Sequence, residues 1–169
     1  MGNAPADAGP AEAPVRTTLG VDTDALVHWL MADAPHHDAV RRCFEREIGL
    51  GGRLGLTPQV LRELLHVTTD ARRFEHPLAM EDALRLSLEL WNGREVERLL
   101  PTARDHDRLC ELMERLQLGR RRILDTALAV TLEAAGVRRL ATLNGQDFKI
   151  FPFVEIVDPT AGGEAEPEP

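Results

Sequence analysis

Apolar positions along the chain follow two different spacings. Short apolar runs predict strands, at residues 17–21, 53–56, around 96, 137–143 and 154–157. Longer segments with apolar residues three or four positions apart predict helices, at residues 25–31, 38–48, 58–67, 78–90, 103–116 and 123–135. Because strands and helices alternate, we expect an α/β fold with a central, mainly parallel sheet flanked by helices, in which ligands bind at the carboxyl ends of the strands.

The two ends of the chain differ in composition from the part between them. Residues 1–16 and 160–169 are rich in Ala, Pro, Gly and Glu, so we expect disordered extensions around one folded domain at 17–159. No segment has the roughly 18 consecutive apolar residues of a membrane span, and the N-terminus lacks the basic start and apolar segment of a secretory signal. We therefore expect a cytoplasmic protein with no membrane partner.

The formal net charge of −8 shows no basic footprint of the kind that nucleic-acid-binding proteins usually carry. The ends account for part of this charge, because the chain without them has 23 acidic and 19 basic residues. If several of the remaining acids bind cations together, the surface that faces the substrate is less negative still. Net charge therefore does not exclude a nucleic-acid partner.

Two aspartates stand where a solvated helix face does not explain them. Asp22 directly follows the first predicted strand, which places it at the carboxyl edge of the sheet, although an aspartate here would also cap the next helix. Asp125 lies within the most apolar predicted helix, where an unpaired carboxylate would cost several kcal/mol or become protonated. It needs a partner, and the nearby Arg120, Arg121 and Arg122 offer a purely structural ion pair.

Two further segments carry side chains with oxygen atoms. Glu63 borders the apolar stripe of its predicted helix, and an exposed glutamate would explain it equally well. The segment 141–148, Ala-Thr-Leu-Asn-Gly-Gln-Asp-Phe, follows a predicted strand and places Thr142, Asn144 and Asp147 on a turn, which Asn-Gly alone would also explain. The combination of all four segments is more informative than any one of them.

Taken in order, these segments resemble the motifs of PIN-domain nucleases, especially the VapC-type toxins of bacterial toxin–antitoxin pairs. The resemblance runs from Val21 to Pro159. It rests on Val-Asp-Thr-Asp-Ala-Leu at 21–26, Thr-Pro-Gln-Val-Leu-Arg-Glu at 57–63, Ile-Leu-Asp-Thr-Ala-Leu-Ala at 123–129, the segment 141–148 and Val-Asp-Pro at 157–159. The resemblance implies a PIN-like three-layer α/β/α fold.

The resemblance also implies roles for individual residues. Asp22, Glu63 and Asp125 would bind metal, Asp147 would be a fourth and more variable acid, and Thr142 and Asn144 would lie near metal or substrate. The family commonly has Asn at the position of Asp24 and often has an acid at the position of Asn144. Asp147 and Asn144 are therefore both candidates for the fourth ligand, and we expect Asp24 to take the capping role.

The chemistry that the resemblance implies is metal-dependent endoribonuclease activity, the hydrolysis of RNA phosphodiester bonds by a toxin. The partners that it implies are an antitoxin protein that blocks the site and a second copy of the chain in a homodimer. Ligands that are all oxygen suit Mg²⁺, with Mn²⁺ as a substitute, and the metal would activate a water for in-line attack on phosphorus. Because Lys149 is the only lysine, arginines must bind the RNA backbone, and Arg120, Arg121 and Arg122 are the best candidates.

Two alternative functions follow from the same residues. Asp22-Thr-Asp24 after a strand also resembles the start of haloacid-dehalogenase-type phosphatases, in which Asp22 would be the nucleophile. That family needs a later lysine followed by an acidic pair, and Lys149 comes late, with only Glu155 and Asp158 after it in the predicted folded domain. The second alternative is a catalytically silent binding domain whose acids are structural, which the intact acids at the three main positions disfavour.

Overall fold

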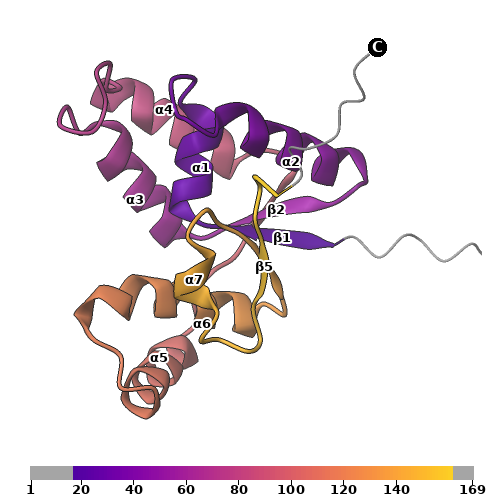
Figure 1. Ribbon diagram of the computed structural model, residues 1–169, viewed down its shortest axis with the longest axis vertical. Coiled ribbons are helices and arrows are strands. Elements are labelled where there is room, and N and C mark those ends of the chain that lie inside the picture. Colours follow the sequence, from indigo (N-terminus) through magenta and orange to yellow (C-terminus); the bar gives the residue numbers. More distant parts are fainter. Residues whose placement is uncertain (1–16, 162–169) are drawn as a thin grey trace, which may run out of the picture.

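The computed structural model describes residues 17–161, which form a sheet with helices on both of its faces (Figure 1). The strands are β1 Thr18–Val21, β2 Arg53–Leu56, β3 Val96–Arg98, β4 Arg139–Ala141 and β5 Glu155–Val157. All neighbouring strands pair in parallel, in the order β3–β2–β1–β4–β5. The predicted α/β fold is confirmed. The predicted extensions lie outside the described residues, except for Thr160 and Ala161.

The helices form the two outer layers. They are α1 Thr23–Leu30, α2 His37–Gly49, α3 Pro58–Thr68, α4 Met80–Trp91, α5 Ala103–Arg115, the 3₁₀ helix η1 Arg120–Arg122, α6 Ile123–Ala134 and α7 Gly145–Phe148. Figure 1 shows α1 to α4 on one side of the sheet and α5 and α6 on the other. None of the helices between residues 17 and 161 combines the length and the apolar character that crossing a bilayer would require.

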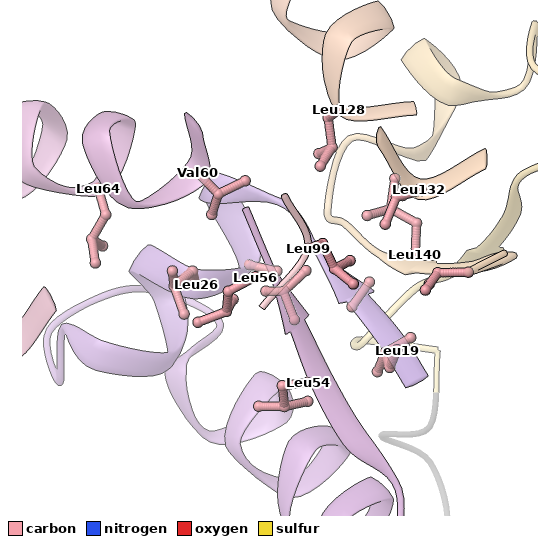
Figure 2. Close-up of a cluster of buried hydrophobic side chains, with 14 of the residues drawn as sticks. Leu19, Leu26, Leu54, Leu56, Val60, Leu64, Leu99, Leu128, Leu132 and Leu140 are labelled. Carbon is pink, nitrogen blue, oxygen red and sulfur yellow. The ribbon is translucent and has the colours of Figure 1, made fainter. Parts of the chain in front are cut away.

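The hydrophobic core fills the space between the sheet and both helix layers. Figure 2 shows leucines of the strands between Leu26 and Leu64 of one layer and Leu128 and Leu132 of the other. Gly20 permits this packing on β1, because a Cβ atom there would lie 2.6 Å from Leu132 Cδ2. The central strand is therefore closely covered by α6, which brings the start of that helix to the carboxyl edge of the sheet.

Helix α6 differs from the prediction at its start and agrees with it at its end. The sequence predicts the most apolar helix of the chain here, which would suit a buried position, but Ile123 and Leu124 are 43% and 51% exposed. The reason is that this first turn lies beyond the core, where Leu124 lines an open cleft. The helix ends just before Gly136, whose φ of +69° is a conformation that glycine adopts without strain.

Candidate active site

The strand order creates a crevice at the carboxyl edge of the sheet. From β1 the chain proceeds to β2 and β3 on one side, and later to β4 and β5 on the other, so the ends of β1 and β4 flank a topological switch point. Asp22 follows β1 and Thr142 follows β4. The Asp22 amide donates to the carbonyl oxygen of Ala141 at 3.0 Å, which holds the two strand ends side by side.

Asp22 is held from both sides of this crevice. Its Oδ1 accepts from the Thr23 amide at 2.7 Å, as the N-cap of α1, and its Oδ2 accepts from the hydroxyl of buried Thr142 at 2.9 Å. The Thr142 hydroxyl also accepts from the Asn144 amide at 3.0 Å. Asp22 therefore caps α1 and also faces the crevice, because each role uses a different carboxylate oxygen.

Asp24 does not take the capping role that the sequence predicted for it. Its Oδ1 accepts from the Leu143 amide at 3.3 Å and from the Ala25 amide at 2.5 Å. This side chain therefore ties the first turn of α1 to the loop after β4. It adds a second carboxylate beside Asp22.

Burial and mutual repulsion perturb the pKa values of these carboxyls. Burial, followed by the charge of Asp24, raises the pKa of Asp22 from 3.8 to about 7, against the hydrogen bonds from Thr142 and Thr23. Burial also raises the pKa of Asp24 and of Asp125. For Asp125, Arg122 opposes this effect, whereas nearby acids, first among them Asp147, reinforce it. This edge of the sheet therefore carries more negative charge than it can easily keep ionised.

Asp125 and Asp147 meet at one arginine. Nη1 of Arg122 lies 3.5 Å from Asp125 Oδ2 and also forms an ion pair with Asp147. Asp147 accepts a further hydrogen bond from the side-chain amide of Asn144. The structural Asp–Arg pair that the sequence offered as an alternative is thus present, whereas Arg120 and Arg121 of η1 are exposed. The segment 141–148 is more than the predicted turn, because it contains α7.

Glu63 reaches the crevice from α3. Its Oε1 accepts from Gln59 Nε2 at 2.8 Å, and its Oε2 accepts from Thr23 Oγ1 at 3.3 Å. Gln59 Nε2 also lies 3.0 Å from the carbonyl oxygen of Leu124, so Gln59 joins α3 to the start of α6. Sequence reasoning missed Gln59 and Thr23 as site residues. The available signal was spacing, since Gln59 lies one helical turn before Glu63 and Thr23 adjoins Asp22.

A cleft of about 620 Å³ opens over these side chains. Its lining consists of Asp22, Thr23, Asp24, Val27, His28, Glu63, His66, Val67, Arg73, Phe74, Leu124 and Asn144. The sequence did not single out the histidines, Arg73 as a site residue, or Phe74. Asp125 and Asp147 lie beside the cleft, around Arg122. Within residues 17–161, no three His, Cys, Asp or Glu side chains stand close enough to hold one metal ion as they are.

Known proteins are similar to this chain in sequence or in fold. Ribonuclease VapC24 of Mycobacterium tuberculosis is 29% identical over 141 residues, which cover 83% of this chain and 96% of that protein. The crystal structure of M. tuberculosis VapC20, described as a Sarcin-Ricin loop cleaving toxin, matches with a TM-score of 0.61 at 14% identity, over 79% of this chain and 95% of that one. VapBC-1 from nontypeable Haemophilus influenzae matches with a TM-score of 0.61 at 17% identity, over 85% and 99%.

A family model gives the assignment directly. The model described as the PIN domain matches residues 20–154, which include the ends of β1 and β4, all of α3 and α6, and each of the four predicted acids. The structural matches agree with it in fold. The resemblance inferred from the motifs is confirmed, and this chain belongs to the PIN domain family.

Proposed function

We propose that this protein is a metal-dependent endoribonuclease and the toxin of a toxin–antitoxin pair. The observation that carries the proposal is the approach of Asp22, Glu63, Asp125 and Asp147 to one edge of the sheet from four separate segments. Their proximity is reflected in the pKa of Asp125, which Asp147 and Glu63 both raise. Two relatives support the substrate, since VapC24 is named a ribonuclease and VapC20 is described as a toxin that cleaves the sarcin-ricin loop.

The chemistry of the side chains fits a hard divalent cation. All the candidate ligands are carboxylate oxygens, which Mg²⁺ and Mn²⁺ prefer, and no thiolate of the kind that zinc favours lines the cleft within residues 17–161. A cation would also favour the ionised form of Asp22 and Asp125, whose pKa values are raised, so binding would release protons. Because Arg122 now bridges Asp125 and Asp147, its guanidinium would have to leave these two carboxylates for them to hold a cation.

The residues of the chain have distinct tasks in the proposed hydrolysis. The bound ion supplies an activated water and stabilises the leaving oxygen. Thr142 and the Thr23 amide fix the carboxylate of Asp22, while Gln59 and the Thr23 hydroxyl fix that of Glu63. Glu63 is then placed to orient the attacking water or to accept its proton.

The arginines are the proposed contacts to the RNA backbone. Arg120 and Arg121 are exposed beside Arg122, at the start of the helix that carries Asp125. Arg122 would join them once it leaves the two aspartates, because a guanidinium matches a phosphate with two parallel hydrogen bonds. Asn144, which lines the cleft, is a further proposed substrate contact.

The proposed partners are an antitoxin and a second copy of the chain. Helix α4 offers a face for one of them, since Met80, Leu84 and Leu88 follow one another at four-residue intervals and are 55%, 46% and 62% exposed. Light scattering of the purified protein tests the homodimer. Charged substitutions at Leu84 and Leu88 test whether co-expressed antitoxin needs this face.

The direct test of the activity is RNA cleavage by the purified protein. We expect structured RNA to be cut in Mg²⁺ or Mn²⁺ and to remain intact in excess chelator. Asp22→Asn and Asp125→Asn should each lower the rate by about 100-fold or more. Asp107→Asn, an exposed acid on α5, is the matched control and should keep full activity. Cleavage in chelator, or full activity of both site variants, would contradict the proposal.

A further inference from the structure

The active-site cleft extends past the acids that the proposed hydrolysis uses. Helices α1 and α3 begin at the carboxyl edge of the sheet, where these acids lie, and pack against each other as they leave it (Figure 1). The part of the cleft farther along them is called the outer half below. It is lined by Val27, His28, His66, Val67, Arg73 and Phe74. A cleft of about 620 Å³ exceeds the needs of a hydrated cation and has the size of an organic ligand site.

Helix α3 gives the order of the groups along the site. In its first turn, Gln59 donates to the carbonyl oxygen of Leu124 at 3.0 Å, so the start of α6 and the arginines of η1 belong to this end. Glu63 follows one turn later and Val67 one turn after that, and each step of four residues is about 6 Å along the helix axis. Arg73 comes after the far end of α3. The acids therefore lie between two groups of arginines, as a site crossed by an RNA strand requires.

Arg73 is a cation that contributes little to holding its own loop. The carboxylate of Asp70 accepts from the Arg72 amide at 3.0 Å and from Nε and Nη2 of Arg72 at 3.0 and 3.1 Å. Nε of Arg73 lies 3.9 Å from Asp70 Oδ2, which is too long for a hydrogen bond, and the Arg73 side chain is 59% exposed. The backbone of Arg73 is nevertheless fixed, because its amide donates to the Asp70 carbonyl oxygen at 2.9 Å. Its guanidinium is thus available to an anion at a defined position.

Phe74 adds an aromatic ring beside this cation. The chain has five phenylalanines and no tyrosine, and the core buries Phe44, Phe148 and Phe151. Phe74 packs against the core but is only partly buried, and it lines the outer half together with Val67. Within residues 17–161, it is the only Phe, Tyr or Trp that lines the cleft. An aromatic ring next to a free guanidinium matches a nucleotide, which has a flat base and an anionic phosphate.

We propose that the outer half binds a nucleotide next to the scissile phosphate, with its base stacked on Phe74 and its phosphate bound by Arg73. This inference rests on the proposed ribonuclease function and adds RNA contacts on the side of the acids opposite η1. Stacking on a ring does not read the edge of a base, so the subsite accepts any base. It requires an unpaired nucleotide, because a base inside a duplex is already stacked on its neighbours.

Binding of a short RNA tests the subsite without any cleavage. Fluorescence anisotropy would measure the Kd of labelled hexaadenylate for the full chain in excess chelator, over a range of salt concentrations. Phe74→Leu keeps an apolar side chain but loses the ring, and it should raise Kd about 10-fold, whereas Phe74→Trp should bind at least as tightly as the wild type. Arg73→Gln should also weaken binding and reduce the slope of log Kd against log salt by about 0.7. The matched control is Arg41→Gln, an exposed arginine of α2 that does not line the cleft, and it should behave as the wild type.

Several results would overturn the subsite. A wild type that binds no hexaadenylate in chelator would do so even if a variant failed to fold, because neither proposed contact needs a metal. An unchanged Kd of Phe74→Leu would remove the base stack, and an unchanged salt slope of Arg73→Gln would remove the phosphate contact. A peptide of alternating Glu and Leu that displaces the RNA, depends on both residues and binds more tightly would assign the outer half to a protein partner.

Cleavage of RNA then connects the subsite to the reaction. In an oligoribonucleotide cut at one position, an abasic residue at one nucleotide beside the cut should lower kcat/KM about 10-fold for the wild type and have little effect for Phe74→Leu. Equal losses in both proteins at every nearby nucleotide would contradict the subsite and leave the ribonuclease function standing. The expected binding pattern in a protein that cuts no RNA would refute the proposed function and leave the nucleotide subsite standing.

Discussion

Replacing Asp22 by Asn should stabilise the metal-free protein at alkaline pH, although it removes a residue of the proposed active site. Folding moves the pKa of Asp22 from 3.8 to about 7, mainly because the carboxyl is buried and lies beside Asp24. The folded state therefore holds a proton that the unfolded state releases. Stability is lost as the pH rises from about 4 to about 7, and the loss is complete above that range.

The size of the effect follows from the pKa change. Each pH unit of difference corresponds to about 1.4 kcal/mol, so the ionised carboxylate costs the folded protein about 4 kcal/mol at pH 8. Asn has one acceptor oxygen, so the Thr142 hydroxyl must reverse its bond to residue 22, at a cost of about 1 kcal/mol. We therefore expect Asp22→Asn to gain about 3 kcal/mol at pH 8, or about 10 °C in Tm.

Thermal unfolding followed by circular dichroism in excess chelator measures this gain. The wild type, Asp22→Asn and the exposed control Asp107→Asn would be compared at pH 4.5 and pH 8. The gain of Asp22→Asn should nearly vanish at the lower pH, where the wild-type carboxyl is protonated in the folded state. A variant less stable than the wild type at pH 8, or a gain equal at both values, would refute the burial argument.

Three further predictions concern the cation, the core ion pair and the packing of β1. In thermal unfolding at pH 8, Mg²⁺ at about 100 times its Kd should stabilise the wild type by about 2.7 kcal/mol. It should stabilise Asp125→Asn by much less. An equal shift in both proteins would show that Asp125 does not bind the metal. Arg139→Ala should lower the free energy of unfolding in urea by about 3 kcal/mol, because it leaves buried Glu47 without the guanidinium that it contacts at 2.7 and 3.0 Å. A loss below about 1 kcal/mol would show that Glu47 is well solvated. Gly20→Ala should lower the free energy of unfolding by about 1–3 kcal/mol in the same assay, because its Cβ would lie 2.6 Å from Leu132 Cδ2 and 3.2 Å from the Arg139 carbonyl oxygen. An unchanged urea midpoint would mean that α6 shifts freely.

The fold was predictable because its main signals are local and periodic. Alternating apolar spacings placed α2 and β2 within a residue of their observed bounds. Helix α7 was missed for the same reason, since a helix of four residues has no periodicity and Asn144-Gly145 predicts a turn. The exposure of Ile123 and Leu124 was missed because spacing along a helix does not reveal where the core ends.

The candidate site was predictable in its residues but not in its contacts. Acids at a strand end and in an apolar helix stand out in a sequence, as Asp22 and Asp125 did. Two readings treated as alternatives proved to hold together: Asp22 caps a helix and faces the crevice, and Asp125 pairs with Arg122 while it lies among acids. The bridge formed by Gln59 joins residues 65 positions apart, so no local pattern announces it.

The central claim is that Asp22, Glu63, Asp125 and Asp147, at the carboxyl edge of the sheet, hydrolyse RNA with a metal-activated water. The most direct measurement is the chemistry of the cut ends, determined by mass spectrometry after cleavage of a short RNA in Mg²⁺. Attack by water leaves a linear monophosphate on one product and a hydroxyl on the other, whereas attack by the neighbouring 2′-hydroxyl leaves a 2′,3′-cyclic phosphate. We predict linear ends from the wild type and no products from Asp22→Asn or Asp125→Asn; cyclic ends, or products formed in chelator, would contradict the account.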